Sequence, residues 1–241
     1  MQTANFKLSH TNKLFLPYDI YERHRQIGSL IKNSQSVLDV GGELNQLSQF
    51  CKPDKIIVAN LQSSMEKSDI AIGKDKLPFS KDSFDVVTAI DVLEHIPKNK
   101  RSNFIWQILE VAKDKMILSF PISSEKHNTY EKEIEGWLVS KQKDVTYLKE
   151  HIKFGLPTPS EINELTKGLK CRIFYSGNIN LNKYLFKLYL FDPNIKFIRK
   201  FIYFLKLFFN FLTNSLFYYF LTNKKLTNNV NRAYLIINKG R

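Results

Sequence analysis

The stretch of the chain best suited to acid–base chemistry is "DVLEHIP", which runs from Asp91 to Pro97. Asp91, Glu94 and His95 are spaced by three and four residues, so a helix that begins here would present them on one face. An imidazole exchanges protons near neutral pH, and His95 could therefore serve an acceptor hydroxyl as a general base or as a hydrogen-bond partner. A purely structural role, in which Glu94 and His95 cap and brace the helix, is the alternative.

A second stretch, "VLDVGG", ends an apolar run with an acid and two glycines. Asp39 follows Val37 and Leu38, and Gly41 and Gly42 come next. Glycine is favoured where the backbone takes a positive φ or passes close to a ligand. The order of strand, acid and glycine pair is therefore typical of a loop that holds a cofactor, although a tight turn between a strand and a helix would use the same residues.

Together with a longer segment downstream, this stretch resembles a known family. The segment "LPFSKDSFDVVTAIDVLEHIP", from Leu77 to Pro97, and the earlier "VLDVGG" are similar to class I S-adenosylmethionine-dependent methyltransferases of the small-molecule and glycan type, described as methyltransferase type 11-like. The resemblance covers about residues 36–122. It implies a Rossmann-like, doubly wound α/β fold with a seven-stranded, mostly parallel sheet and an antiparallel last strand. It also implies that S-adenosylmethionine binds at the carboxyl ends of the strands, where open α/β sheets hold their ligands.

The resemblance assigns cofactor contacts to particular positions of this sequence. Asp39 would hold the ammonium group of the cofactor, directly or through water. Gly41 and Gly42 would let the backbone pass close beneath the methionine part of the cofactor. Asp91, which follows the fourth expected strand, is assigned to the same cofactor site.

Other positions depart from the family pattern. Asn60 stands where the family usually has an acid that grips both ribose hydroxyls; an amide can accept from one hydroxyl and donate to the other. Near the adenine the family commonly has Asp where this chain has Gly73, and Asp75 would substitute for it. Two further glycines of the first loop are replaced by Glu43 and Asn45. These departures favour an alternative function, a non-catalytic binding or scaffold protein that retains the fold with a degenerate cofactor site.

The function that the resemblance implies is methyl transfer to a small-molecule, glycan or lipid-linked acceptor, at oxygen. Glu94 and His95 are the expected catalytic residues. His151, in "LKEHIKFGLP", is a third, because the region after the fifth strand often closes over the acceptor in this family; a solvated loop histidine is the alternative. The order Asp-x-x-Glu-His also resembles the magnesium-binding element of certain O-methyltransferases. The same letters occur in metal-free relatives, so we expect no bound metal.

Short apolar runs alternate with helical patterns between residues 20 and 170, which is typical of a parallel sheet with crossover helices. We expect a methyltransferase core with an N-terminal helix at 1–180, a Phe-rich basic helical insertion at 181–225 and a final core strand at 226–241. Ser160 is expected to cap the last core helix, and Glu150 and His151 are expected in a loop. The expected strands are 36–41, 55–60, 69–72, 84–90, 115–120, 171–177 and 232–238. The expected helices are 18–32, 43–50, 91–95 with a continuation at 98–112, and 159–168.

The insertion is unusually aromatic: residues 181–223 contain 15 of the 32 Phe, Tyr and Trp residues of the chain. The pattern predicts a helix from about 197 to 221 with a narrow polar stripe and a broad apolar face. A membrane-spanning helix is less favoured, because the polar stripe interrupts the apolar run. Two interpretations stay open: an interfacial helix pair on an anionic membrane, rimmed by Lys and Arg, or a lid or homodimer interface. The stripe comprises Lys206, Asn210, Thr213 and Asn214, the apolar face comprises Phe201, Leu205, Phe208, Leu212, Leu216 and Phe220, and the basic rim comprises Lys196, Arg199, Lys200, Lys224 and Lys225.

The formal charge of +13 is concentrated near the C-terminus. Residues 181–241 hold 11 Lys and Arg against one acid, a net of +10, whereas residues 1–180 hold 25 against 22, a net of +3. Nucleic acid is a disfavoured partner, because the basic residues are interleaved with an apolar face. Two widely separated cysteines and an N-terminus without a secretory pattern predict a cytoplasmic protein, which could be peripheral at the inner membrane face.

Overall fold

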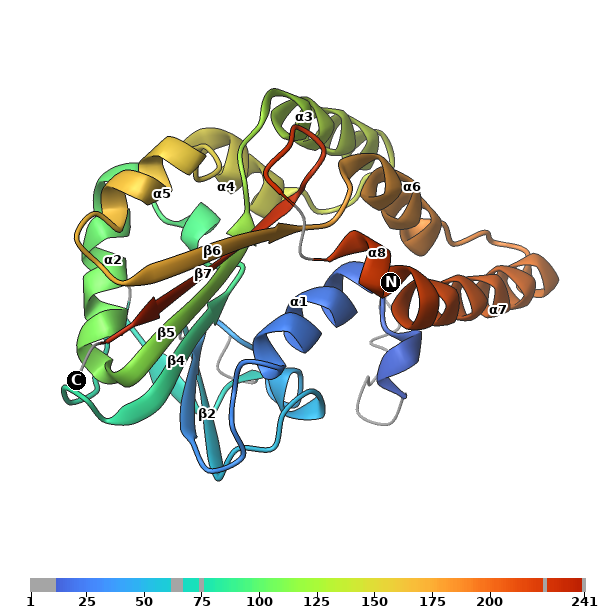
Figure 1. The fold of residues 1–241 in the computed structure, drawn as a ribbon. Coiled ribbons are helices and arrows are strands. Elements are labelled where there is room, and N and C mark those ends of the chain that lie inside the picture. Colours follow the sequence, from blue (N-terminus) through green and yellow to red (C-terminus); the bar gives the residue numbers. More distant parts are fainter. Residues whose placement is uncertain (1–11, 62–66, 74–75, 223–224, 240–241) are drawn as a thin grey trace.

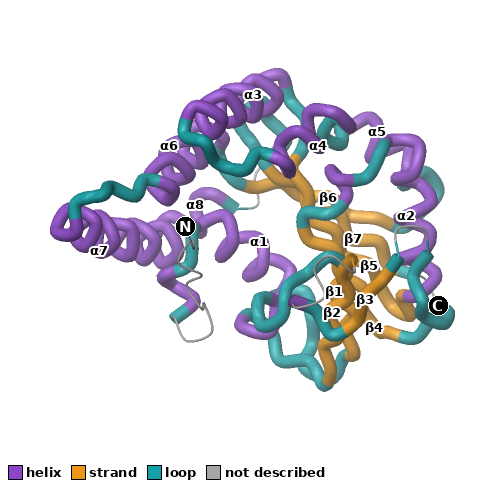
Figure 2. Tube along the Cα trace, turned by 180° about the vertical axis from the view of Figure 1, so that it is seen from behind, coloured by secondary structure: helices purple, strands orange, loops and turns teal. Residues whose placement is uncertain are grey.

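The computed structural model describes residues 12–61, 67–73, 76–222 and 225–239. At its centre lies a seven-stranded sheet with the order β3-β2-β1-β4-β5-β7-β6 (Figures 1 and 2). Neighbouring strands are parallel except at β7, which is antiparallel to both β5 and β6. The expected doubly wound, seven-stranded α/β fold is therefore confirmed. The strands are β1 Ser36–Val40, β2 Lys55–Leu61, β3 Ile70–Ile72, β4 Phe84–Ile90, β5 Ala112–Pro121, β6 Cys171–Ser176 and β7 Arg232–Asn238.

The central strands are buried on both faces, as is usual for parallel strands that helices cover. In β1, Leu38 belongs to the core on one face of the sheet and Val37 to the core on the other. Side chains of α2 (Lys98–Val111) and α5 (Pro159–Leu165) pack on the first face, and α1 (Tyr18–Gly28) packs on the second (Figure 1). This arrangement leaves the carboxyl ends of the parallel strands open for a site.

The loop after β1 does not form the expected helix at 43–50. It contains one short 3-10 turn, η3 (Leu47–Gln49), and Asn45 has a left-handed φ of 64°. A right-handed helix cannot continue through a left-handed residue. The helix expected to start at Asp91 is also absent there, because Asp91 has a φ of 55° and helical structure begins with η5 (Leu93–His95).

Two helices that the sequence pattern did not predict lie between β5 and β6: α3 (Glu125–Ser140) and α4 (Thr146–Phe154). Glu150 and His151 therefore lie on a helix, and the prediction of a loop was wrong. The apolar side chains of α3 and α4 are few and form a small cluster apart from the sheet. Such a short cluster gives a weak helical pattern in the sequence, which explains why α3 was missed.

Two helix boundaries also differ from the expectation. The N-cap of α5 is Thr158, not Ser160: the Thr158 hydroxyl accepts a hydrogen bond from the Glu161 amide at 3.1 Å, and the Glu161 side chain bonds back to the Thr158 amide. This reciprocal arrangement is a capping box, which only a residue three positions before the Glu can form. At its other end α5 stops at Leu165, and α1 ends at Gly28, both earlier than expected.

The chain between β6 and β7 forms the expected helical insertion (Figures 1 and 2). Its elements are α6 Ile179–Leu190, α7 Lys196–Leu212, η6 Thr213–Phe217 and α8 Tyr218–Leu221. A π-helical turn, η6, interrupts the single helix predicted over 197–221. The first helix, α6, packs against α3, whereas α7 and η6 pack against the N-terminal turn η2 (Lys13–Phe15) and α1. No helix in the described part of the chain is both long and apolar enough to cross a membrane.

Candidate functional site

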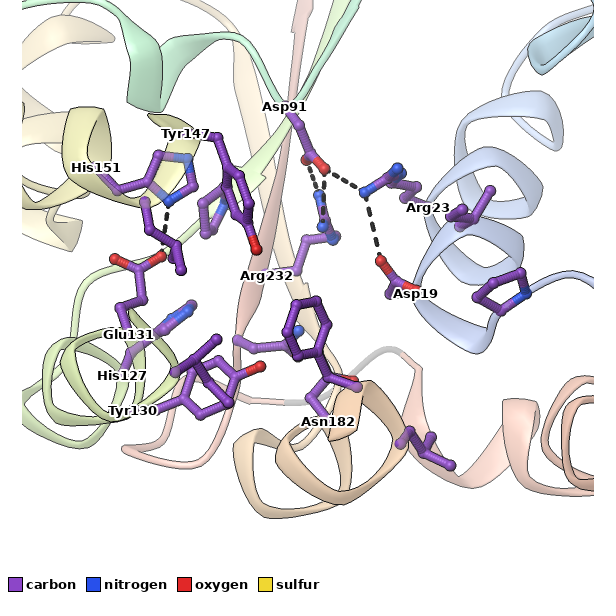
Figure 3. A pocket seen from close by; sticks show the side chains of 18 of the residues that line it. Asp19, Arg23, Asp91, His127, Tyr130, Glu131, Tyr147, His151, Asn182 and Arg232 are labelled. Carbon is purple, nitrogen blue, oxygen red and sulfur yellow. Dashed lines mark hydrogen bonds and ion pairs between the residues drawn. The ribbon is translucent and has the colours of Figure 1, made fainter. Parts of the chain in front are cut away.

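A cavity of about 300 Å³, here called the main pocket, opens at the carboxyl ends of β4 and β5 (Figure 3). Its walls come from α1, α3, α4 and the insertion helix α6. Asp91, Glu94, His95 and His151 all line it. The structure therefore brings three predicted catalytic residues and one predicted cofactor residue to the same pocket, although they come from two separate regions of the chain.

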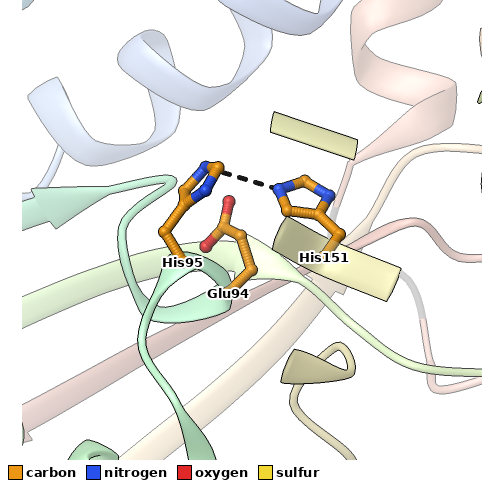
Figure 4. Close-up of side chains that lie close together, drawn as sticks. All are labelled: Glu94, His95 and His151. Atoms are coloured by element: carbon orange, nitrogen blue, oxygen red, sulfur yellow. Dashed lines mark hydrogen bonds between the residues drawn. The ribbon is translucent and has the colours of Figure 1, made fainter. Parts of the chain in front are cut away.

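His95 and His151 face each other across the wall of the main pocket (Figure 4). Their Nε2 atoms lie 3.4 Å apart. The Nδ1 atom of His95 lies 2.7 Å from a carboxylate oxygen of Glu150, and the Nδ1 atom of His151 lies 2.8 Å from one of Glu131. An ionised carboxylate only accepts hydrogen bonds, so each Nδ1 carries the hydrogen of its neutral ring and each Nε2 presents a lone pair. The pair is thus arranged to share a single proton or cation.

Burial shifts the pKa values of His95 and of the neighbouring Glu94. Burial lowers the pKa of His95, the neighbouring His151 lowers it further, and the hydrogen bond that His95 donates to Glu150 opposes both effects. Glu94 is 1% exposed, and burial together with the charge of Asp91 raises its pKa well above the usual value. Its Oε2 atom has no hydrogen-bond partner in the described structure. A buried oxygen without a partner next to two imidazole lone pairs points to a ligand in this corner of the pocket.

The same atoms are suited to a metal ion. Glu94, His95 and His151 each offer one ligand atom, and these atoms lie within 4.8 Å of one another. Two imidazoles and one carboxylate form a donor set typical of divalent transition metals, and the carboxylates on both Nδ1 atoms are the usual outer partners of ligating histidines. A cation bound here would polarise an oxygen of the acceptor. The residues therefore fit a cation, but His151 replaces Asp91 in the expected Asp-x-x-Glu-His set.

Asp91 turns away from the histidines towards two arginines (Figure 3). Arg23 and Arg232 both donate to its carboxylate, and Arg232 also donates to the Ser119 hydroxyl at 2.9 Å. Burial alone would raise the pKa of Asp91, but the two guanidinium groups outweigh it and hold that pKa well below its usual range. Asp91 is thus an ionised carboxylate that ties α1 to β7, and the shared helical face expected for Asp91, Glu94 and His95 does not form.

The residues expected to hold the methionine part of a cofactor form a tight cradle after β1. Asp39 is fully buried; one carboxylate oxygen accepts from the Thr88 hydroxyl at 2.7 Å, and Oδ2 has no partner in the described structure. Burial raises the pKa of Asp39 to about 7, although the Thr88 bond opposes the shift. A Cβ at Gly42 would lie 2.0 Å from Asp39 Oδ2, and one at Gly41, where φ is 78°, would lie 2.4 Å from Val92 Cγ2. Both glycines are therefore required, and the cradle with its unpartnered oxygen fits the cofactor role.

Asn60 lies at the end of β2 with its amide already engaged. Its Nδ2 donates to the Gly42 carbonyl at 2.9 Å, and its Oδ1 accepts from the Leu61 amide at 2.8 Å. The side chain therefore braces the glycine loop from the neighbouring strand. To bind the ribose hydroxyls with its amide, Asn60 would have to break its hydrogen bond to the Gly42 carbonyl.

The remaining departures from the family pattern have separate outcomes. Asn45 adopts the left-handed backbone that the replaced glycine would favour, which Asn tolerates better than most residues. Glu43 needs no such backbone, and its carboxylate pairs with Lys67 at 2.9 Å. Gly73 has open space around it, with no atom within 4 Å of a Cβ placed there. Asp75, the expected adenine contact, lies outside the described residues.

Two site residues were not identified from the sequence: Glu131, which bonds His151, and Arg232, which bonds Asp91. Arg232 precedes the apolar run "AYLII" and is buried with it, and a cation at the start of a buried strand is the signal that could have indicated it. Glu131 lies on α3, the helix that was missed, and nothing in its local sequence connects it with a histidine 20 residues away.

No protein-family model and no curated protein sequence matches the chain. Several solved structures are similar to the chain in their fold. A methyltransferase of Thermotoga maritima, described as a possible histamine N-methyltransferase, superposes with a TM-score of 0.55 at 12% identity, over 92% of this chain and 100% of that one. An S-adenosylmethionine-dependent methyltransferase of Archaeoglobus fulgidus superposes with a TM-score of 0.53 at 12% identity, over 92% of this chain and 94% of that one. A putative methyltransferase of Haloferax volcanii, in complex with the activator Trm112, superposes with a TM-score of 0.51 at 13% identity, over 92% of this chain and 89% of that one. The chain therefore has the class I S-adenosylmethionine-dependent methyltransferase fold.

Proposed function

We propose that this protein is an S-adenosylmethionine-dependent methyltransferase that methylates an oxygen of an acceptor held in the main pocket. The observation that carries the proposal is the pair of Nε2 atoms 3.4 Å apart on the pocket wall, beside the buried Glu94 carboxyl. A pair of basic nitrogens that each present a lone pair is suited to receive the proton of an acceptor hydroxyl.

The residues on the pocket wall perform the acid–base part of this reaction. When bound, S-adenosylmethionine would supply an electrophilic methyl group on a positively charged sulfur. The Nε2 atom of His95 or His151 takes the proton of the acceptor hydroxyl, and Glu150 and Glu131 stabilise the imidazolium that results. The walls of the pocket hold the acceptor in line, and alignment of this kind contributes much of the rate in methyl transfer.

The cofactor end of the proposal rests on the cradle formed by Asp39, Gly41 and Gly42. The unpartnered Oδ2 of Asp39 would hold an ammonium group directly or through water, and a nearby ammonium would favour its ionised form. Asn60 would contact the ribose and Asp75 the adenine. Asp91 would contribute through the arginines that it positions.

The pocket lining supports an acceptor with both apolar and polar parts. Tyr130, Ile134, Tyr147 and Tyr189 line the pocket together with Arg23. Aromatic walls with a few convergent polar groups suit a small molecule, a glycan or the head of a lipid-linked intermediate.

A second candidate is a non-catalytic binding protein with the same fold. It is favoured by one observation, the Asn60 amide that is bonded to the Gly42 carbonyl where the family has a ribose-binding acid. Both cysteines are free, which supports a reducing compartment such as the cytoplasm for either function.

Calorimetric titration of the purified protein with S-adenosylhomocysteine tests the proposal. We expect saturable binding with one ligand per chain. A folded protein that shows no heat of binding at millimolar ligand would contradict the methyltransferase function and leave the binding protein as the better interpretation.

A further inference from the structure

The helix α7 presents a row of phenylalanines to solvent. Phe197, Phe201, Phe204, Phe208 and Phe211 are spaced by four and three residues in turn, so they lie along one face, here called the aromatic stripe. Their exposed fractions are 82%, 61%, 56%, 56% and 41%. No residue of α7 is buried. Contiguous exposed apolar surface of this kind marks an interaction site rather than ordinary protein surface.

The polar side of the same helical segment faces the protein. Asn210 donates to the Phe15 carbonyl at 2.9 Å, and Asn214 donates to the carbonyls of Leu14 at 3.0 Å and Leu16 at 2.8 Å. Asn214 is 1% exposed. A surface helix of a globular protein normally has the opposite orientation, with its apolar face inwards. Turning the aromatic stripe inwards would break these three hydrogen bonds, so the outward orientation is fixed by the fold.

We propose that the aromatic stripe docks the protein on the surface of an anionic lipid bilayer, with α7 lying in the plane of the headgroups. Helices that bind membranes in this way combine a bulky apolar face with Lys and Arg beside it. Because α7 has 17 residues, it is about 26 Å long. It is not suited to cross the membrane.

The charge of the insertion selects the bilayer over a second copy of the chain. Residues 181–223 hold six Lys and Arg against one acid, a net of +5, and that acid, Asp192, is paired with Arg199 at 3.1 Å. Lys196 and Lys200 are exposed next to the stripe. Two copies that met through the stripe would bring two such positive segments together, whereas anionic headgroups attract them.

Docking would also place the main pocket beside the membrane, because α6 and Asn210 of α7 line that pocket. A lipid-linked acceptor could then enter without leaving the bilayer. This step rests on the proposed methyltransferase function, whereas the docking itself does not.

Liposome flotation of the full chain tests the docking independently of activity. We expect the protein to float with vesicles of two parts phosphatidylcholine and one part phosphatidylglycerol, and to remain below with phosphatidylcholine alone. The double variant Phe204→Glu/Phe208→Glu should lower the bound fraction about tenfold or more, because it puts two charges into the apolar face. Both side chains are exposed, so circular dichroism should show an unchanged fold. Trp106→Glu is the matched control: Trp106 is 55% exposed on α2, and its loss should leave flotation unchanged.

A charge variant and a mass measurement complete the test. Lys196→Glu/Lys200→Glu should also weaken binding, by about tenfold, and high salt should weaken binding of the wild-type protein. Flotation that Phe204→Glu/Phe208→Glu does not reduce would overturn the proposal. A second outcome would also overturn it: light scattering shows that the wild-type protein is a dimer and the variant a monomer, and neither protein binds vesicles. The aromatic stripe would then be an interface between two copies. S-adenosylhomocysteine binding measured on the same samples shows separately whether the methyltransferase proposal holds.

Discussion

The Nε2 atoms of His95 and His151 lie 3.4 Å apart although 56 positions separate the two residues in the chain. Each ring is oriented by a different carboxylate, Glu150 for His95 and Glu131 for His151. This geometry makes the pair the centre of the proposed chemistry.

Replacing His151 by Asn should reduce methyl transfer while leaving S-adenosylhomocysteine binding unchanged. A lost general base typically lowers the rate by about 10²- to 10⁴-fold, and the Asn amide can still donate to Glu131, which keeps that buried carboxylate partnered. The measurement is kcat with a methyl acceptor identified by screening, together with the calorimetric affinity. A variant that turns over as fast as the wild-type protein would remove His151 from the mechanism.

The pH dependence should show an acid limb below pH 6.5, the ordinary pKa of histidine. Burial and the neighbouring His151 lower the pKa of His95, so the ring loses its proton at a lower pH and is available as a base there. Glu150 opposes this shift by stabilising the protonated ring. Glu150→Gln should therefore move the acid limb of kcat/KM to still lower pH. A shift to higher pH would show that another group controls this limb.

Replacing Gly42 by Ala should abolish cofactor binding and destabilise the fold. The added Cβ would lie 2.0 Å from Asp39 Oδ2, and forcing a group into a closed site commonly costs about 1–3 kcal/mol. Gly73→Ala is the matched control, since no atom lies within 4 Å of a Cβ there. Thermal unfolding and calorimetry should separate the two variants. Equal affinity of Gly42→Ala and wild-type protein would place the cofactor elsewhere.

Zn²⁺ should inhibit the proposed reaction, because the same Nε2 lone pairs cannot bind a cation and accept a proton. Glu94→Gln should weaken this inhibition by removing the carboxyl that would ionise on binding the ion. Because we expect no bound metal, EDTA should not lower the initial rate of methyl transfer by the purified protein. If instead EDTA abolished activity and Mg²⁺ or Mn²⁺ restored it, the cluster would be a resident metal site and the expectation of no metal would be wrong.

The sequence by itself determined the sheet and the cradle. The seven expected strands coincide with β1 to β7 within a few residues. The signal is strongest in β1 and β4, because a strand buried on both faces needs a continuous apolar segment. Gly41 and Gly42 could be identified from the family resemblance. The requirement at Gly42 is local, because a Cβ there would meet Asp39, whereas a Cβ at Gly41 would meet the distant Val92. The prediction of a helix at 43–50 was wrong because Asn45 has a left-handed backbone. The presence of Asn in a sequence does not by itself predict that conformation.

Only the tertiary structure decided which distant groups meet and which way the insertion faces. His95 and His151 are brought together by the packing of α4 against η5, and Asp91 is drawn away by arginines from α1 and β7. The sequence pattern gave α7 a polar and an apolar face, but the pattern is the same whichever face lies inwards. The backbone carbonyls of Leu14, Phe15 and Leu16 fix the polar side inwards. Contacts of this kind depend on where the N-terminal turn lies in space, which local spacing along the chain does not specify.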